Sequence, residues 1–219
     1  MEKYAIVIAG PSGAGKTTVA DALMEKLGNL EMSRSATTRQ KRGDGRDDEY
    51  VYLTREEFEA SIAASDVVEY TEYNGNLYGT RKCELNRIFE MGKYPILVLD
   101  YNGVKSLKES LDYPVFAIYV YVDLKEAEAR LRKRDVAPDP TNQAKLDAFE
   151  KRLRANVADY GVLHTMADMF DYYAENDELD ECVSEISAAL DIMKSKDEAM
   201  SSDFKRYLTD GFKTEAEEF

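Results

Sequence analysis

The feature that most constrains this chain is a glycine-rich turn near its beginning. A short apolar run, residues 5–9, leads directly into the segment GPSGAGKT at positions 10–17. This segment matches the pattern G-x-x-x-x-G-K-[ST], in which successive backbone N–H groups curl around a polyphosphate. Glycine permits the curl because it adopts positive φ angles at no steric cost. The sequence therefore predicts a phosphate-binding loop between a strand and a helix.

Each part of this loop has an expected task. The helix predicted over residues 15–27 points the positive end of its dipole at the bound anion. The side chain of Lys16 is expected to reach the β- and γ-phosphates of ATP, and the hydroxyl of Thr17 to coordinate Mg²⁺. The loop residues that we predict to bind ATP are Gly10, Pro11, Ser12, Gly13, Ala14, Gly15, Lys16, Thr17 and Thr18.

The loop alone does not separate ATPases, GTPases and kinases. GTPases usually carry an N-K-x-D segment that reads guanine, and this sequence has none. Motor-type ATPases are generally larger and assemble as rings. A chain of 219 residues therefore favours a small-molecule kinase.

The length and composition fit one folded domain, or one domain with inserted lobes. Hydrophobic residues make up 44% of the chain, which is enough for a sizeable core and excludes disorder over most of its length. The net charge is −14, from 29 basic and 43 acidic residues. This charge repels nucleic acid and anionic membranes at long range, so we expect neither as a partner. An anionic ligand then requires a local basic patch.

The cysteines and the apolar runs predict a cytoplasmic protein. Cys83 and Cys182 match no paired metal-ligand spacing and are expected to be reduced thiols, with a disulfide as the alternative. The run at residues 5–9 is shorter than the roughly 7–15 residues of a signal-peptide core. The longest run, residues 114–122, is less than half of the ~20 residues that span a bilayer.

Apolar runs alternate with segments of helical spacing along most of the chain. Such runs predict strands at residues 4–9, 94–99, 115–122 and 169–174. Helical spacing occurs at residues 15–27, 81–91, 104–111, 124–134, 144–163 and 179–193. This alternation predicts an α/β fold with a largely parallel sheet covered by helices.

Three segments interrupt this rhythm. Between residues 31 and 76 the candidate strands, 50–53 and 67–73, are polar and alternating, which predicts a small antiparallel lobe. The segment DVAPDPT at residues 135–141 predicts a mobile loop. The acidic segment from Ser195 onward has few large apolar side chains, and we expect a loosely packed helix or a frayed tail there.

The basic patch lies between residues 31 and 46. Its segment SATTRQKR, residues 35–42, places Arg39 and Arg42 three positions apart behind hydroxyl residues. Arginine forks suit a phosphate that is held by bidentate hydrogen bonds. A solvated basic loop is the alternative interpretation.

These motifs together resemble the guanylate kinases. The phosphate loop, S-x-T-T-R-x-x-R, Tyr50-x-Tyr52, Glu69, Tyr78-Gly79-Thr80 and Asp100-x-x-Gly103 follow in the order and near the spacing of that family, over about residues 3–193. The resemblance implies a P-loop NTPase core with a parallel sheet flanked by helices, a small antiparallel NMP-binding lobe and a mobile lid. The implied boundaries are core 1–33 and 82–193, NMP-binding lobe 34–81, lid about 134–152, and an acidic C-terminal extension 194–219 without a counterpart in the family.

The resemblance also implies roles for individual residues. The residues that look like the clamp on the GMP phosphate are Arg39, Arg42, Tyr50 and Tyr78. Those that look like readers of guanine are Ser35, Glu69, Thr80 and Asp100. A carboxylate can accept from guanine N1–H and the 2-amino group, which adenine does not present in that arrangement. Glu69 could instead be the solvent side of an alternating strand, and either tyrosine could serve packing alone.

Further implied residues belong to the lid and the adenine site. Arg134 and Arg152 match the two lid arginines, with Arg130 and Arg154 as competitors and surface salt bridges as the alternative. Asn176 follows the last predicted strand, where the family contacts adenine. The implied catalytic set is Lys16, Arg39, Arg134 and Arg152.

Two features depart from the family pattern. Val98 stands where the family usually has an acid near Mg²⁺ and the loop lysine. The segment between Arg134 and Arg152 is longer than the usual lid.

The resemblance implies Mg²⁺- and ATP-dependent phosphorylation of GMP, with dGMP also accepted, by direct in-line transfer in a monomer or homodimer. The departures leave open a related kinase for another nucleoside monophosphate or a ribose phosphate. A guanylate-kinase-like binding module without activity is the third alternative, which the intact Lys16 and Thr17 disfavour.

Overall fold

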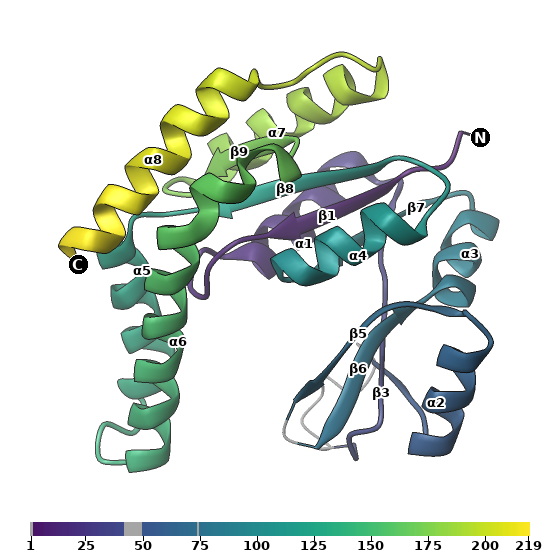
Figure 1. Ribbon diagram of the computed structural model, residues 1–219, viewed down its shortest axis with the longest axis horizontal. Coiled ribbons are helices and arrows are strands. Elements are labelled where there is room, and N and C mark those ends of the chain that lie inside the picture. The colour runs from purple at the N-terminus through teal and green to yellow at the C-terminus, as the bar shows by residue number, and fades with distance from the viewer. Residues whose placement is uncertain (1, 42–49, 74) are drawn as a thin grey trace. The chain divides into compact units, whose positions relative to one another are not determined.

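The structure is a computed structural model that describes residues 2–41, 50–73 and 75–219 (Figure 1). The chain forms two compact units. One comprises Met1–Val7 and Met24–Val115, and the other Ile8–Leu23 and Phe116–Phe219. Strand β1 (Ala5–Ala9) and helix α1 (Lys16–Leu27) have residues in both units.

The first unit contains one part of a parallel sheet. Strands β2 (Leu30–Met32) and β7 (Tyr94–Val98) pair in parallel, with Leu30 opposite Tyr94, and β7 is followed in the strand order by β1. All five residues of β1 are buried, as its unbroken apolar run predicts. Helices α3 (Lys82–Glu90) and α4 (Tyr101–Ser110) precede and follow β7.

The same unit contains a separate four-stranded sheet. Its order is β4 (Tyr50–Tyr52), β3 (Ser35–Thr37), β6 (Asn76–Arg81) and β5 (Val67–Tyr73). The β3–β6 and β5–β6 pairs are antiparallel, as predicted for this lobe, whereas β3 and β4 are parallel, so the sheet is mixed.

Helix α2 (Arg55–Ala63) lies next to β4 in the chain and completes the core of this lobe. Thr54 and Glu57 form a capping box at its start. Its Phe58 is fully buried and packs with Ala36 and Leu77. The sequence analysis did not predict this helix, because Phe58 and Ile62 are the two large apolar residues of a polar segment and one such pair gives no clear helical period.

The second unit contains the other side of the parallel sheet. Strand β8 (Val115–Tyr121) pairs in parallel with β9 (Tyr172–Glu175), and the full order is β2-β7-β1-β8-β9. Helices α5 (Leu124–Leu131), α6 (Gln143–Leu163) and α7 (Leu179–Lys194) confirm the predicted alternation of strands and helices. The α/β fold class is therefore confirmed.

The prediction for the final segment was wrong about packing. The final segment contains helix α8 (Ser202–Glu218), which packs against α6 (Figure 1). The side chains of Lys205, Thr209 and Phe212 are buried. A single aromatic side chain, Phe212, is enough to pack this helix against its unit because its ring enters an existing cluster of aromatic side chains. None of the helices in the described ranges has the length and apolar character needed to cross a membrane.

Candidate functional site

The turn after β1 has the backbone geometry of an anion-binding loop. Gly10, Gly13 and Gly15 have φ angles of +143°, +92° and +84°. A Cβ atom on Gly10 would lie 1.9 Å from the carbonyl oxygen of Val120, and one on Gly15 would lie 2.5 Å from Nδ2 of Asn176. Both positions therefore require glycine for close approach as well as for φ.

Lys16 is the cation of this loop. Its Nζ donates to the carbonyl oxygens of Gly10 at 2.9 Å and of Pro11 at 2.8 Å. Burial, together with the positive charge of nearby Arg134, lowers the pKa of Lys16 to about 8, while the negative charge of Asp159 opposes this shift. The amine is therefore held inside the loop, where the binding of an anion next to it is favourable.

A pocket of about 310 Å³ opens at this loop. Its lining residues are Ser12, Gly13, Gly15, Lys16, Thr17, Thr18, Arg130 and Arg134. The structure thus brings most of the predicted ATP-binding residues together, while Pro11 and Ala14 are buried behind them. Three basic side chains and the N-terminus of α1 make this pocket suitable for a polyphosphate.

Two buried asparagines hold the loop in place. Asn156 on α6 donates through Nδ2 to the carbonyl oxygen of Ser12 and accepts the Ser12 N–H at Oδ1, both at 2.8 Å. Asn176 donates to the carbonyl oxygen of Ala14 at 2.7 Å. Asn176 is therefore placed beside the predicted ATP site with its amide engaged by the loop.

The sequence analysis missed Asn156. Its signal is a polar, poor helix former on the face of α6 that carries Phe149 and Tyr160. A buried amide on an otherwise apolar helix face needs polar partners, and here they are the backbone groups of Ser12.

A second pocket, of about 430 Å³, lies in the first unit. Five of the predicted GMP-binding residues line it: Ser35, Tyr50, Glu69, Tyr78 and Asp100. Val98 and, unpredicted, Thr71, Asn102 and Ser106 also line it. Two carboxylates in a pocket with several hydroxyl groups provide acceptors and donors for a purine base.

Glu69 and Asp100 are the acidic groups of this pocket. Oε1 of Glu69 accepts from the hydroxyl of buried Thr80 at 2.7 Å. Burial raises the pKa of Glu69, and the negative charge of Asp100 adds to the rise, whereas the bond from Thr80 opposes it. Asp100 caps α4, with Oδ1 accepting from Gly103 N–H at 2.9 Å.

Aromatic rings surround the predicted phosphate clamp. The guanidinium of Arg39 lies 5.2 Å from the ring centre of Tyr50 and donates to the hydroxyl of Tyr52 at 3.1 Å. The rings of Tyr50 and Tyr78 meet edge to face at 6.3 Å. The structure therefore groups Arg39, Tyr50 and Tyr78, while Arg42 lies outside the described residues.

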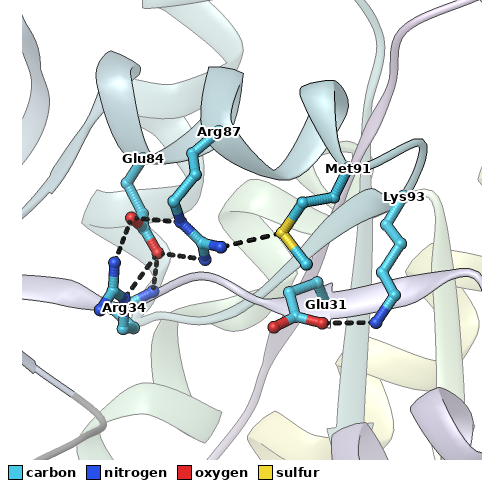
Figure 2. A network of polar contacts seen from close by, with 6 residues as sticks. All are labelled: Glu31, Arg34, Glu84, Arg87, Met91 and Lys93. Atoms are coloured by element: carbon cyan, nitrogen blue, oxygen red, sulfur yellow. Dashed lines mark hydrogen bonds and ion pairs between the residues drawn. The ribbon is translucent and has the colours of Figure 1, made fainter.

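A charged network fixes the backbone just before Ser35 (Figure 2). Nε and Nη2 of Arg34 each donate to the carboxylate of Glu84 at 3.0 Å, and the backbone N–H of Arg34 donates to it at 3.3 Å. Arg87 supplies two more bonds to Glu84, at 2.8 and 2.9 Å. The Glu84 side chain is only 6% exposed, and these bonds lower its pKa to about 2 against the opposing effect of burial.

Comparison with known proteins identifies the family. The family model for guanylate kinase matches residues 2–193. The chain belongs to the guanylate kinase family. It is 33% identical over 186 residues to a guanylate kinase of Clostridium perfringens, covering 84% of this chain and 81% of that protein. It is 34% identical over 187 residues to the guanylate kinase of Homo sapiens, covering 84% and 91%.

A solved structure agrees on the fold. The crystal structure of guanylate kinase from Anaplasma phagocytophilum superimposes with a TM-score of 0.60 at 24% identity, covering 92% of this chain and 88% of that one. The family model and the relatives of similar sequence confirm the resemblance that the motifs indicated.

The two lid arginines implied by the guanylate kinase pattern share one carboxylate. Arg134 donates to Asp135 at 2.7 and 2.9 Å, and Arg152 donates to it at 2.6 Å. The hydrogen bonds of Arg134, together with the charge of Arg152, lower the pKa of Asp135. Arg134 also lines the loop pocket, as does Arg130, which donates to the carbonyl oxygen of Asn176 at 3.0 Å.

The residues present fit a magnesium ion bound together with the nucleotide. Thr17 is exposed, lines the loop pocket and offers a hydroxyl oxygen, a hard ligand of the kind that Mg²⁺ prefers. Mg²⁺ commonly keeps several waters and takes its other ligands from substrate phosphates. Val98 lines the other pocket and contributes no metal ligand.

Proposed function

We propose that this protein transfers the γ-phosphoryl group of ATP to GMP, and also to dGMP, forming ADP and the nucleoside diphosphate. The family supports this reaction. The observation that carries the proposal in this chain is the coexistence of an intact, cationic phosphate loop in one unit and a two-carboxylate pocket with an arginine–tyrosine cluster in the other.

In the proposed donor site, the γ-phosphate of ATP draws Lys16 from the loop carbonyls. Arg134 and Arg152 neutralise the charge that spreads over the transferring group, and the backbone of residues 10–17 orients the phosphates. Thr17 would hold Mg²⁺ together with the phosphates, and the ion would supply further charge neutralisation. Asn176 serves this site by holding the loop beside the adenine position.

In the proposed acceptor site, Glu69 and Asp100 accept from the N1–H and 2-amino groups of guanine. Ser35 and Thr80 complete the base site, and Arg39, Arg42, Tyr50 and Tyr78 hold the phosphate. A phosphate oxygen of GMP then forms a bond to the γ-phosphorus while the bond from that phosphorus to the bridging oxygen of ADP breaks. No covalent enzyme intermediate is required.

The boundaries proposed for these tasks are an NMP-binding lobe at residues 34–81 and a lid at about 134–152, on a core of 1–33 and 82–193. We also propose a cytoplasmic monomer or homodimer that acts on small nucleotides and not on nucleic acid or membranes. The net charge of −14 supports this partner class.

The test is ADP release measured with ATP and Mg²⁺ against GMP, dGMP, AMP, CMP, UMP, dTMP and ribose phosphates. We expect GMP to have the highest kcat/KM. Glu69→Gln should raise the KM for GMP, while Glu72→Gln, an exposed position on the same strand, should not. Preference for another acceptor, or no turnover with any, would contradict the proposal.

A further inference from the structure

Helix α8 lies outside the part of the chain that matches the family model, which ends at residue 193. Ser201 caps its start, and one face of the helix is buried through Lys205, Thr209 and Phe212. On the other face, Tyr207 is 76% exposed. The helix therefore has a defined docking face within its own unit, which is the unit that contains the phosphate loop.

Phe212 joins α8 to α6. Its ring centre lies 4.8 Å from that of Tyr160 and 4.7 Å from that of Tyr121. The hydroxyl of fully buried Tyr160 donates to the carbonyl oxygen of Val122 at 2.5 Å. Phe212 thus covers the side chain that attaches α6 to the end of β8.

The attached part of α6 is also the part that holds the phosphate loop. Asn156 precedes Tyr160 by four residues, so the two side chains lie on the same helix face, one turn apart. Tyr160 fixes one turn against β8, and Asn156 makes its two bonds to Ser12 from the next. Movement of this turn would shift the partner of Ser12.

Glu215 joins α8 to α5. Its carboxylate accepts a hydrogen bond from the backbone N–H of Leu124, in the first turn of α5, where a negative charge also complements the helix dipole. Farther along α5, Arg130 lines the loop pocket, and the chain then leads to Arg134. One helix outside the family match therefore contacts two helices, α5 and α6, that bring side chains to the loop.

We propose that α8 is an internal brace of the ATP-binding site, with Phe212 and Glu215 as positioning residues for Asn156 and Arg130. The inference rests on the proposed role of the loop in binding ATP. It predicts that loosening α8 weakens the binding of ATP and leaves the binding of GMP unchanged, since the GMP pocket belongs to the other unit.

The experiment measures the Kd values of ATP and of GMP by calorimetry, with Mg²⁺ present, in full-length variants at a temperature well below their unfolding transitions. Phe212→Ala and Glu215→Ala should each raise the Kd of ATP on the order of tenfold and change that of GMP less than about twofold. Glu215→Gln keeps an acceptor for the Leu124 N–H and should retain most of the affinity for ATP. Tyr207→Ala is the matched control on the exposed face of the same helix.

The outcomes separate the inference from its alternatives. Lower thermal stability with an unchanged Kd for ATP would overturn it and leave α8 a purely stabilising element. An equal rise in the Kd values of ATP and of GMP would also overturn it. If Phe212→Ala fails to fold, the Kd values of ATP for Glu215→Ala and Glu215→Gln still test the inference. A wild-type chain that binds ATP and transfers nothing to GMP would contradict the proposed function, and the effect of α8 on ATP would be measured all the same.

Discussion

The position of Lys16 in the fold changes the pKa of its amine, and this makes the binding of ATP depend on pH. Its amine is held by two backbone carbonyls in the loop, and its pKa is lowered to about 8. Bound phosphates favour the charged amine and raise that pKa again. ATP binding above pH 8 must therefore take up a proton.

We expect the Kd of ATP to rise with pH above about 8, by up to about tenfold per pH unit. Calorimetry in two buffers of different ionisation enthalpy should show uptake of nearly one proton at pH 9 and only about 0.1 at pH 7. Lys16→Met serves as the control, since it should bind weakly without this uptake. Equal uptake in the variant and the wild type would assign the proton to another group.

Glu69 is expected to make the binding of GMP depend on pH in the acidic range. Its pKa is raised, chiefly by burial, and the protonated acid cannot accept from two guanine donors. We expect the KM for GMP to rise as the pH falls, beginning above the ordinary pKa of glutamate, while the KM for ATP changes less. Glu69→Gln should raise the KM for GMP about tenfold and remove this acid dependence. An unchanged acid dependence in the variant would show that Glu69 is not the group responsible.

At the scale of elements, α3 secures the chain between β2 and β3. Glu84 on α3 binds both the backbone and the guanidinium of Arg34, the residue before Ser35 (Figure 2). The folded carboxylate has a pKa of about 2, whereas the unfolded one has the ordinary value of 4.5. Since the folded pKa is the lower, the stabilisation is complete above the unfolded value and is lost as the pH falls toward 2.

We expect Glu84→Gln to lower the free energy of unfolding at pH 7 by about 2 to 3 kcal/mol, because it removes the charge that both arginines share. Urea unfolding of both proteins at pH 7 and pH 3 is the measurement, with Glu90→Gln, exposed on the same helix, as the control. The difference between wild type and Glu84→Gln should shrink at pH 3. A constant difference would mean that the carboxylate charge contributes little.

At the scale of the whole molecule, the two units have a strand and a helix in common. β1 and α1 each have residues in both units, so we expect the unfolding of one unit to disrupt part of the core of the other. We expect one cooperative thermal transition, with equal calorimetric and van't Hoff enthalpies. ATP alone and GMP alone should each raise the temperature of that transition. Two separable transitions, of which ATP shifts only one, would contradict this expectation.

The sequence predicted most where one physical signal dominates. The apolar runs of β1, β7 and β8 and the spacing of α6 and α7 identified the parallel α/β core within a few residues. The short strand β3 and helix α2 have no such run or period, and β3 acquires its pairing only from β4 and β6. Local patterns cannot report such long-range partners.

The residues of the two candidate sites likewise include some that the sequence could predict and some that it could not. The loop residues are adjacent in sequence, so their pocket could be predicted. The order of the family motifs predicted five residues that line the second pocket. Asn156 and Phe212 were not found, because each acts through a contact with a residue far away in the chain, Ser12 and Tyr160 respectively. Their polar or aromatic character alone does not name that partner.

We expect the two carbonyls that hold Lys16 to make the loop respond differently to different anions. A ligand that draws the amine away must replace two hydrogen bonds, from Gly10 and Pro11, before it gains any net affinity. A triphosphate can do so, because it meets several backbone N–H groups and cations at once. Chloride or a single inorganic phosphate meets fewer of them, so we expect it to draw the amine from the carbonyls less readily than a triphosphate does.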